Sequence, residues 1–523
     1  MDPVIVVGSG PVGLSLSLAL AGHGVPCVLF DEGPGKDEPR PARSVVLHSD
    51  TAAMVHRLGC TTLGDEGAQY AAWRTMRRRQ EVRRITFEDH PAPLHLPQHA
   101  LTRGLRAAAA AHPLVQLAPD TKLESLEQDG RGVTVQTRGG HTTWWRGSHL
   151  VGCDGARSTV RKLLGIRFPG RTAVERHAVA ALRAELPWPG EALLHRNPPS
   201  GPEEITARPL TDGIWRLDWL LPPRGDLVTP DALVTLIRDT LALWCGGSTP
   251  PYDLIDTGVH IQHHRLARRW RDGRAFLAGD AAHLLGALGT QSVEEGLRDA
   301  ENLSWKLALD WHQGASEALL DSYEGERRTA VAARLRAADQ TMPVLRGGAG
   351  LRSLLPGSGR SAEGLLTDGH LGRGPLGGRP VYAPPVAVRE VPTATEPGGA
   401  VANVPVSAPD GSTVPLRDLL GRGRLLVLLV APGTGVWDRR HWAGAGLMPR
   451  LAAAVSALPV PAELLVADAY PGAPAHTVLL VRPDGHLAAT FAGVRPAELY
   501  AAADTVRAGA PAGAPATPAP VID

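Results

Sequence analysis

The sequence predicts an α/β protein, and three separate stretches of the chain carry this prediction. Each contains a short apolar run that indicates a buried strand, a glycine or aspartate at the strand end, and then a helical pattern. The stretches begin at Val4, His149 and Arg274. In an open α/β sheet, ligands bind outside the carboxyl ends of the strands. We therefore expect a sheet of this kind with binding groups at one edge.

The first stretch has the order strand, glycine turn, helix and second strand. Gly8 allows the turn, Gly10 lets a pyrophosphate approach the backbone, and Gly13 lets the helix lie close to the strand. The second strand ends at Asp31 and Glu32, and Asp31 follows Gly8 by 23 residues, the reach expected for an acid that binds a ribose. The pattern predicts a Rossmann-like dinucleotide site, and a plain strand-to-helix loop is the alternative.

Composition narrows the class of protein. With 54 Lys+Arg against 53 Asp+Glu in 523 residues, no charge excess favours nucleic acid or an anionic membrane. The N-terminus lacks a basic segment, and the longest apolar candidate, Leu425 to Val430, is far too short for a membrane span. Four scattered cysteines without a CxxC pair argue against disulfides and a zinc site. We expect a reduced, cytoplasmic protein with no metal site and two or three domains.

Arg43 and a group of six arginines can each be interpreted in two ways. Arg43 lies on a loop next to the predicted dinucleotide site, where it would hold a phosphate, and an ordinary surface residue is the alternative. Six arginines between Trp73 and Arg84 indicate either a solvated hairpin face or a docking patch for the phosphates of a nicotinamide cofactor. Neither group decides the function by itself.

The other two stretches each place an aspartate at a strand end. Asp154 follows the second strand and Asp280 follows the third, so both are expected at the ligand-binding edge. Beyond Asp280, Ser292-Val293-Glu294-Glu295 fits a capping box that opens a long helix, whose N-terminus would point its N–H groups into the site. Glu294 is interpreted either as a plain N-terminal helix acid or as a substrate-facing group.

The chain changes character along its length. Short extended runs, proline turns and one helix indicate a separate sheet, in which Trp215, Trp219 and Trp244 are expected as core residues. A glycine-rich stretch and an Ala/Pro-rich end indicate a linker and a disordered tail. The predicted parts are a dinucleotide-binding domain at 1–175 and 262–345 with 70–100 partly on the substrate side, a substrate-binding sheet at 176–261, a linker at 346–378, a further domain at 379–508 and a tail at 509–523.

With these residues assembled, the chain resembles the class A FAD-dependent aromatic hydroxylases, in particular the tailoring monooxygenases of bacterial aromatic polyketide pathways. Order and spacing match over about residues 1 to 340. The motifs are Gly8-x-Gly10-x-x-Gly13, Cys153-Asp154-Gly155-Ala156-Arg157-Ser158, and Gly279-Asp280-Ala281-Ala282-His283 continued by Asp299-Ala300-Glu301-Asn302-Leu303-Ser304-Trp305-Lys306-Leu307. The resemblance implies a Rossmann-like FAD-binding domain with an interleaved substrate sheet, and NADPH or NADH as a transient reductant.

The resemblance also assigns residues. It places Asp31 at the ribose with Glu32 in reserve, Asp280 at the ribityl and pyrophosphate region, and Asp154 near the flavin and nicotinamide routes. No catalytic base follows from it, and Asp154, Glu294 and His260 are the candidates. The implied cofactor-binding residues are Gly8, Gly10, Pro11, Val12, Gly13, Asp31, Glu32, Arg43, Gln98, Asp154, Gly279, Asp280, Gly289, Gln291, Ser292 and Val293.

The loop after His283 departs from the family pattern. The family has two prolines, two glycines and an asparagine where this chain has Gly286, Ala287, Thr290, Ser292 and Glu294. In the family this loop surrounds the reactive edge of the flavin. The departures therefore affect the reaction type more than FAD binding.

The resemblance implies that NAD(P)H reduces FAD, that O2 forms a flavin C4a-hydroperoxide, and that this oxidises a polycyclic aromatic polyketide in antibiotic biosynthesis. Baeyer–Villiger insertion, epoxidation or oxidative rearrangement of a quinone-like polyketide is the first alternative. A non-oxygenating flavoprotein that acts as a binding partner is the second.

The C-terminal part, from about Gly378 to Arg507, resembles the thioredoxin-like appendage of the same subfamily. It contains no cysteine, which excludes redox exchange by this domain. A packing or dimerisation role is expected instead, in a monomer or a homodimer.

Overall fold

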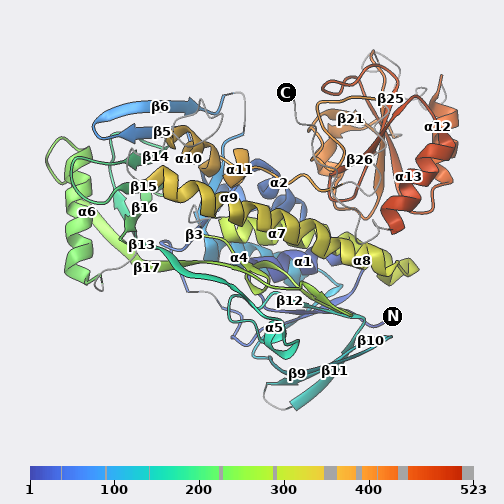
Figure 1. The fold of residues 1–523 in the computed structure, drawn as a ribbon, viewed down its shortest axis with the longest axis horizontal. Helices are drawn as coiled ribbons and strands as arrows, with labels where there is room; N and C mark the ends of the chain where they lie inside the picture. The colour runs from blue at the N-terminus through green and yellow to red at the C-terminus, as the bar shows by residue number, and fades with distance from the viewer. Residues whose placement is uncertain are drawn as a thin grey trace.

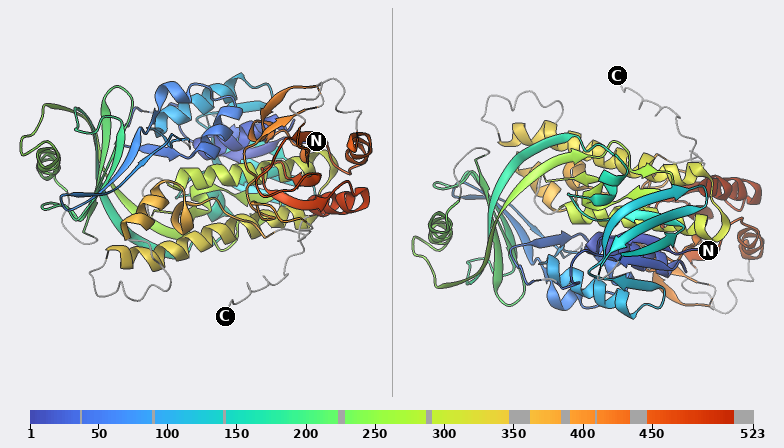
Figure 2. Two further views of the ribbon diagram at one scale, coloured as in Figure 1. Left: turned by 90° about the horizontal axis from the view of Figure 1, so that it is seen from above. Right: turned by 90° about the horizontal axis from the view of Figure 1, so that it is seen from below.

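The computed structural model describes residues 1–36, 38–88, 91–139, 142–222, 228–286, 291–346, 362–383, 391–408, 410–433 and 446–508. The described chain is elongated (Figure 1). A strongly curved sheet lies at one end, a mixed α/β domain at the other, and a central sheet with long helices between them, as both views in Figure 2 show.

The central sheet has six strands in the order β18-β19-β12-β1-β2-β8. The five from β19 to β8 are parallel, and β18 joins antiparallel at the edge. The predicted α/β fold is confirmed by this sheet. Its strands are β1 (Val4–Val7), β2 (Cys27–Phe30), β8 (Val115–Ala118), β12 (His149–Gly152), β18 (Arg271–Asp272) and β19 (Ala275–Leu277).

Three helices cover or adjoin this sheet. In α1 (Pro11–Gly22) the first residue is a proline, whose fixed φ suits a helix start, and residues 13 to 21 are buried. The long α7 (Gln291–Gln313) packs along α1, and α4 (Gln98–Ala111) packs on its other side. Together they hold the N-terminal ends of α1 and α7 at the same edge of the sheet.

The curved sheet has eight strands in the order β20-β17-β13-β16-β15-β14-β5-β6, with α6 (Pro230–Trp244) packed against one face. Trp215, Trp219 and Trp244 are buried in this contact. The strands are β5 (Ala72–Arg77), β6 (Gln80–Thr86), β13 (Gly170–Ala184), β14 (Glu191–Arg196), β15 (Glu204–Pro209), β16 (Ile214–Leu221), β17 (Tyr252–Leu266) and β20 (His283–Leu284).

The arginine-rich hairpin β5–β6 forms the far edge of this sheet. Arg74 and Arg84 both pair with Glu191, and Arg83 pairs with Asp368. These pairings support a solvated hairpin face that docks on acidic neighbours.

Two small sheets and several short helices connect these parts. In the chain between β2 and β13 they are β3 (Ser44–Leu47), α2 (Ser49–Arg57), α3 (Leu63–Glu66), β4 (Ala68–Gln69), β7 (Leu94–Pro97), β9 (Lys122–Asp129), β10 (Gly132–Arg138), β11 (Thr142–Gly147) and α5 (Thr159–Leu163). After β19 they are η1 (Gly279–Ala281), α8 (Glu317–Tyr323), the π-helical turn η2 (Glu324–Arg328), α9 (Thr329–Arg346), α10 (Ala362–His370) and α11 (Gly374–Gly377).

The C-terminal domain is a six-stranded mixed sheet in the order β22-β21-β24-β23-β25-β26, flanked by two helices. Its parallel β23–β24 pair and antiparallel β25–β26 hairpin give the thioredoxin-like arrangement. The elements are β21 (Pro405–Ser407), β22 (Thr413–Pro415), η4 (Leu416–Leu419), β23 (Leu425–Val430), α12 (Met448–Ser456), β24 (Ala462–Ala467), β25 (Thr477–Val481), β26 (Leu487–Ala492) and α13 (Pro496–Ala508).

Buried charges join this domain to α7 and η2. Arg482 binds both carboxylate oxygens of Glu326, and Asp484 accepts from the indole of Trp305. Burial lowers the pKa of Lys306, which donates to Glu326, to about 8. Among the described residues, no helix has both the length and the apolar character that crossing a membrane requires.

Candidate functional site

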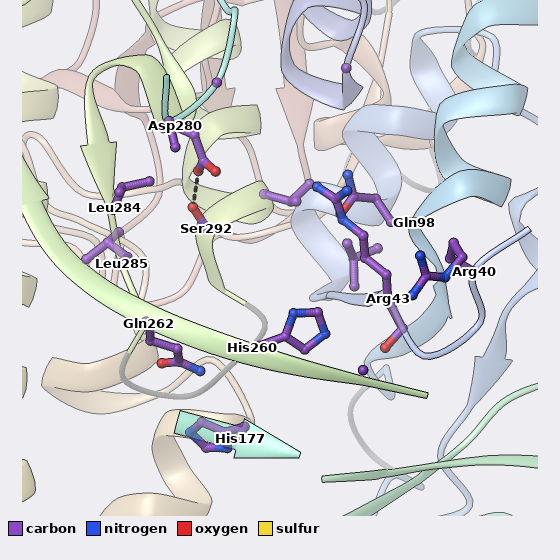
Figure 3. A pocket seen from close by; sticks show the side chains of 18 of the residues that line it. Arg40, Arg43, Gln98, His177, His260, Gln262, Asp280, Leu284, Leu285 and Ser292 are labelled. Atoms are coloured by element: carbon purple, nitrogen blue, oxygen red, sulfur yellow. Dashed lines mark hydrogen bonds between the residues drawn. The ribbon is translucent and has the colours of Figure 1, made fainter. Parts of the chain in front are cut away.

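A cavity of about 630 Å³ lies where the central sheet meets the curved sheet. Its walls come from the starts of α1 and α7, the segment before β3, the turn η1, and strands β13, β16 and β17. Figure 3 shows Arg43 and Gln98 on one side, Asp280 and Ser292 on another, and His177 and His260 on the sheet side. Eight of the predicted cofactor residues line it, namely Gly10, Pro11, Val12, Arg43, Gln98, Asp280, Ser292 and Val293.

The glycines at the start of α1 have three different geometries. A Cβ at Gly13 would lie 1.9 Å from the carbonyl oxygen of Gly8, so only glycine permits this approach of helix and strand. Gly8 has φ of 106° and lies against the backbone of Cys153. A Cβ at Gly10 would meet no described atom within 4 Å, because it points into open space at the cavity wall. This opening suits a ligand that approaches the backbone closely.

The acids after β2 lie behind this turn and outside the lining of the cavity. Asp31 accepts from the backbone N–H of Ser9 at 2.7 Å and of Gly33 at 2.8 Å, so its carboxylate already braces the glycine turn. Each carboxylate oxygen keeps a second lone pair for a ribose hydroxyl. Glu32 points to solvent, with a 73% exposed side chain 3.7 Å from Lys122.

Arg43 and Gln98 form one wall together. Arg43 Nε donates to Gln98 Oε1 at 3.0 Å, and the backbone N–H of Gln98 donates to the Arg43 carbonyl at 2.9 Å. Two segments that lie 55 residues apart in sequence are thereby fixed side by side. Their remaining donors face a cavity with the size and polarity for an anionic ligand.

Asp280 lies opposite them on η1. Ser292, in the first turn of α7, donates its hydroxyl proton to Asp280. Gly279 has φ of 62°, and its N–H donates to the buried Asp299 at 2.9 Å. The turn that carries Asp280 is therefore held at both ends by residues of α7.

A buried ion network supports this turn from below. Arg327 donates to Asp299 at 2.8 Å and to Glu295 at 2.7 Å, and neither its guanidinium nor these carboxylates reach solvent. Arg334 and Arg298 also bind Glu295, whose pKa they hold well below its ordinary value against the opposing effect of burial. The first turns of α7 are thus fixed by charged side chains.

The capping box predicted at Ser292 is wrong. Helix α7 already begins at Gln291, so Ser292 lies inside the first turn and its hydroxyl binds Asp280. Glu295, the expected return partner, is taken by three arginines. A four-residue pattern could not reveal these partners, which come from other elements.

Glu294 does not line the cavity. Its carboxylate is 2% exposed and accepts from His48 Nδ1 at 2.7 Å, from the His48 backbone N–H at 3.1 Å and from Thr51 Oγ1 at 2.7 Å. The structure therefore gives this acid a specific partner in the β3–α2 corner and no contact with the cavity.

Asp154 is also turned away from the cavity. Its Oδ2 accepts from the N–H groups of Thr159 at 2.6 Å and Val160 at 3.0 Å, at the start of α5. Its Oδ1 is buried without a partner among the described residues. Its neighbours Cys153, Gly155 and Ala156 line the cavity in its place.

The sheet wall contains a charged group that the sequence did not indicate. His177 Nδ1 lies 2.6 Å from Asp218 and Nε2 lies 3.2 Å from Glu175. Both partners are carboxylates, so both ring nitrogens donate, and although burial opposes the charge these acids raise the pKa of His177 to about 9. Arg216 pairs with Asp218 at 3.1 Å. Alternating charged residues within otherwise apolar strands, such as Arg216-Leu217-Asp218, were the available signal.

His260 lines the same wall on β17. Burial lowers its pKa, and the positive charge of Arg216 acts in the same direction. His260 is thus held neutral beside the protonated His177. A neutral imidazole can accept or donate a proton to a ligand in the cavity.

A second cavity of about 470 Å³ lies between strands of the same sheet and α9. Val174, Leu220, Leu221 and Met342 give it apolar walls, and Glu175 connects it to the His177 group of the first cavity. Its lining combines these apolar side chains with polar ones such as Arg171, His264 and Asp339, as in many sites for small molecules.

Three further predicted glycines lie behind the cavity wall. Gly8, Gly13 and Gly279 shape the backbone behind the wall, and Gly289 lies outside the described residues. Gln291 opens α7, and its side chain is also outside what the structure describes. Within the described ranges, no cluster of His, Cys, Asp and Glu has the arrangement of a metal site.

The cavity fits FAD by its own geometry. Helix α1 starts at the open face of Gly10, and helix starts present N–H groups without intrahelical partners to a diphosphate. Arg43, Gln98 and Asp280 supply polar side chains around the next part of the cavity, and His260 and Ile261 of β17 line its far side. These residues would hold the diphosphate, the ribityl chain and the ring system respectively.

Comparisons with known proteins agree with this geometry. The family model described as "FAD binding domain" matches residues 1–338. The rifampicin monooxygenase of Streptomyces venezuelae is 32% identical over 374 residues, which cover 68% of this chain and 75% of that relative. The dialkyldecalin synthase of Streptomyces rugosporus is 32% identical over 371 residues, which cover 68% of this chain and 76% of that protein.

A solved structure extends the similarity to the C-terminal domain. OxyS anhydrotetracycline hydroxylase from Streptomyces rimosus superposes with a TM-score of 0.66 at 26% identity, over 94% of this chain and 95% of that one. Other relatives align over less of their length. The chain spans 57% of the 3-(3-hydroxy-phenyl)propionate/3-hydroxycinnamic acid hydroxylase of Mycobacterium sp. strain JLS, at 31% identity over 340 residues that cover 62% of this chain.

Proposed function

The chain belongs to the FAD-binding domain family, among the FAD-dependent monooxygenases, and on this premise we propose that it oxidises a polycyclic aromatic polyketide in antibiotic biosynthesis. The reductant would be NADPH or NADH, and the oxidant O2. One observation carries the proposal: the cavity suited to FAD has a charged sheet wall, and the Glu175–His177 contact connects this wall to a neighbouring cavity with apolar walls.

Bound FAD would supply the electron transfer and the activation of O2, and the protein supplies binding, orientation and electrostatics. The glycine turn at the start of α1 would hold the diphosphate, and Arg43, Gln98 and Asp280 would orient the ribityl chain. N–H groups in the first turn of α7 would favour negative charge on the reduced ring. Apolar groups such as Leu284 and Leu285 would exclude water from that end.

The substrate's ring system would occupy the second cavity. Leu220, Leu221 and Met342 would contact its faces, and Glu175 would accept a hydrogen bond from a ring hydroxyl. Glu175, whose charge the protonated His177 offsets, would keep that ring hydroxyl protonated. A hydroxylated ring is therefore the expected form of substrate.

The test uses the purified protein loaded with FAD. Oxidation of NADPH and of NADH and uptake of O2 are measured with and without alizarin or rifampicin, and products are analysed by mass spectrometry and NMR. The proposal predicts substrate-stimulated uptake of O2 and a product that has gained one oxygen atom. NMR separates ring hydroxylation from insertion, epoxidation or rearrangement. Absence of flavin binding would overturn the proposal.

A second candidate is a flavoprotein synthase that catalyses no net oxidation. Two observations favour it: the similarity to the dialkyldecalin synthase, and the replacement of the family's prolines, glycines and asparagine at Gly286, Ala287, Thr290, Ser292 and Glu294. Conversion of a polyene substrate without consumption of NADPH or O2 would decide for the synthase. Stimulated O2 uptake would decide against it.

A further inference from the structure

The residue that replaces the family's asparagine has a partner that no local pattern reveals. Glu294 lies in the first turn of α7, directly after Ser292 and Val293, which line the cavity. His48 follows β3, where Ser44 and Val45 line the same cavity. The pair is therefore flanked by cavity residues on both chain segments, although 246 residues separate its members.

The geometry around His48 determines its protonation. Nδ1 faces the carboxylate of Glu294 at 2.7 Å, and Nε2 faces the carbonyl oxygen of His370 at 3.3 Å. Neither partner has a proton to give, so both ring nitrogens must donate and the ring is an imidazolium. The ring is fixed in place, because Gly372 packs on it so closely that a Cβ there would lie 2.6 Å from Cδ2.

The charges that face the pair come from four elements. Arg298 of α7 lies 3.6 Å from Glu294 and 3.9 Å from Asp50 of α2. Arg379, after α11, lies 3.3 Å from Asp50, and Arg417 of η4 also acts on Asp50. Burial disfavours the charge on His48, but Glu294 outweighs it and the pKa of His48 is raised. The variants at His48 and Glu294 retain Asp50 and all three arginines.

We propose that His48 is a positioning residue: as an imidazolium it holds Glu294, and with it the first turn of α7, and it neutralises the Glu294 charge next to the flavin end of the cavity. This rests on the proposed FAD function. Reduction adds negative charge to a flavin, so an uncompensated Glu294 carboxylate would disfavour the reduced form specifically. The pair would thereby make the balance between oxidised and reduced FAD depend on pH.

The direction of the pH effect follows from the net charge of the His48–Glu294 pair with His48 protonated and with His48 neutral. While His48 keeps its proton the pair is neutral, and once the pH has risen through the raised pKa of His48 the pair carries one negative charge, with Arg298 unchanged beside it. Wild type should then bind reduced FAD, relative to oxidised FAD, about tenfold more weakly at the higher pH than its Glu294→Gln variant does. At about pH 6 the two proteins should agree.

The measurement is the ratio of dissociation constants of oxidised and reduced FAD, obtained from the potential of the bound and free cofactor at both pH values. His48→Gln should show the weak binding of reduced FAD at both, because its Glu294 is never neutralised. Glu301→Gln is the matched control, since Glu301 is a partly buried acid of the same helix that pairs with Arg57 and Arg379 away from the cavity. It should follow wild type.

Parallel pH dependences in wild type, Glu294→Gln and His48→Gln would overturn the proposal while leaving FAD binding intact. The melting temperatures of the apoproteins test the His48–Glu294 ion pair even if FAD does not bind. Glu294→Gln should lower Tm by about 2–4 °C at about pH 6, and the difference should shrink at about pH 9. An equal loss at both pH values would show that His48 does not hold Glu294 through its charge.

Discussion

Two helices begin at the same cavity and are held there in opposite ways. The start of α1 depends on absent side chains: Gly13 packs on the strand, and Gly10 leaves the backbone open. The start of α7 depends on charged side chains, with Ser292 bound to Asp280, Glu294 to His48, and Glu295 to Arg327. The first arrangement depends on close backbone packing at short sequence spacing, whereas the second is assembled from distant elements and depends on ionised side chains.

The largest expected loss of stability comes from disrupting the charged side chains that hold the start of α7. In Arg327→Met, Asp299 and Glu295 lose a fully buried cation, which is expected to destabilise the protein by about 3–5 kcal/mol. Differential scanning fluorimetry would show a large loss of Tm. The neighbouring Arg328→Met is the control, because Arg328 donates to the carbonyl of Ala267 and, among the described residues, is not part of the buried network. If both variants lost the same stability, the buried network would not be what fixes α7.

Substitutions of the two glycines at the start of α1 should have different effects on stability and on FAD affinity. Gly13→Ala must push α1 away from Gly8, so both Tm and FAD affinity should fall, the latter about a hundredfold or about 2.7 kcal/mol. Gly10 has φ of −73° and free space where a Cβ would lie, so Gly10→Ala should leave Tm unchanged while FAD affinity falls. Fluorescence titration of the apoprotein with FAD measures the affinity of both variants. A Tm loss in Gly10→Ala equal to that of Gly13→Ala would contradict this division.

His177 in the sheet wall should make the stability of the protein depend on pH, as the charged side chains at the start of α7 do. Because the pKa of His177 is raised to about 9, its stabilisation is complete below the unfolded value of about 6.5 and is lost as the pH rises through about 9. The loss is expected to be about 3 kcal/mol. Tm measured from about pH 6 to about pH 10 should fall in wild type and stay flatter in His177→Gln. Equal slopes would mean that His177 is not charged.

The smallest expected effect concerns Asp280, which binds the start of α7 through Ser292. Asp280→Asn keeps an acceptor for Ser292 and removes only the charge, so FAD affinity should change by about threefold to tenfold and Tm very little. Isothermal titration calorimetry with FAD provides the measurement. Ser292→Ala, which leaves the carboxylate but frees it from α7, is the companion variant. A larger loss of FAD affinity in Asp280→Asn than in Gly13→Ala would mean that the charge of Asp280 matters more than the glycine packing.

The two starts also differ in how far they could be predicted from sequence. The α1 turn and the strand ends at Asp154 and Asp280 were predicted because backbone geometry dictates residues at fixed short spacings. The residues around α7 were not, because Ser292 and Glu295 bind partners from η1, η2 and α9. Local pattern therefore suggested a capping box where long-range ion pairs form.

The curved sheet shows the same limit. The short extended runs of this sheet were predicted, but the Asp218–His177 contact requires the register of β13 with β16. The parallel pairing of β14 with β5, which joins Glu191 to Ala72, also depends on tertiary structure alone. Asp154 illustrates a third case: its position at a strand end was predicted, whereas its use as a cap for α5 depends on how the chain turns after Gly155.

Two neighbouring residues of the π-helical turn η2 bind partners in different parts of the molecule. Arg327 binds the network under the cavity, and Glu326 binds Arg482 of the C-terminal domain. Glu326 and Trp305 are synthesised before Arg482 and Asp484, so until the C-terminal domain folds they lack these partners, although Lys306 already binds Glu326. We expect residues 1–338 expressed alone to leave this surface uncovered and prone to aggregation.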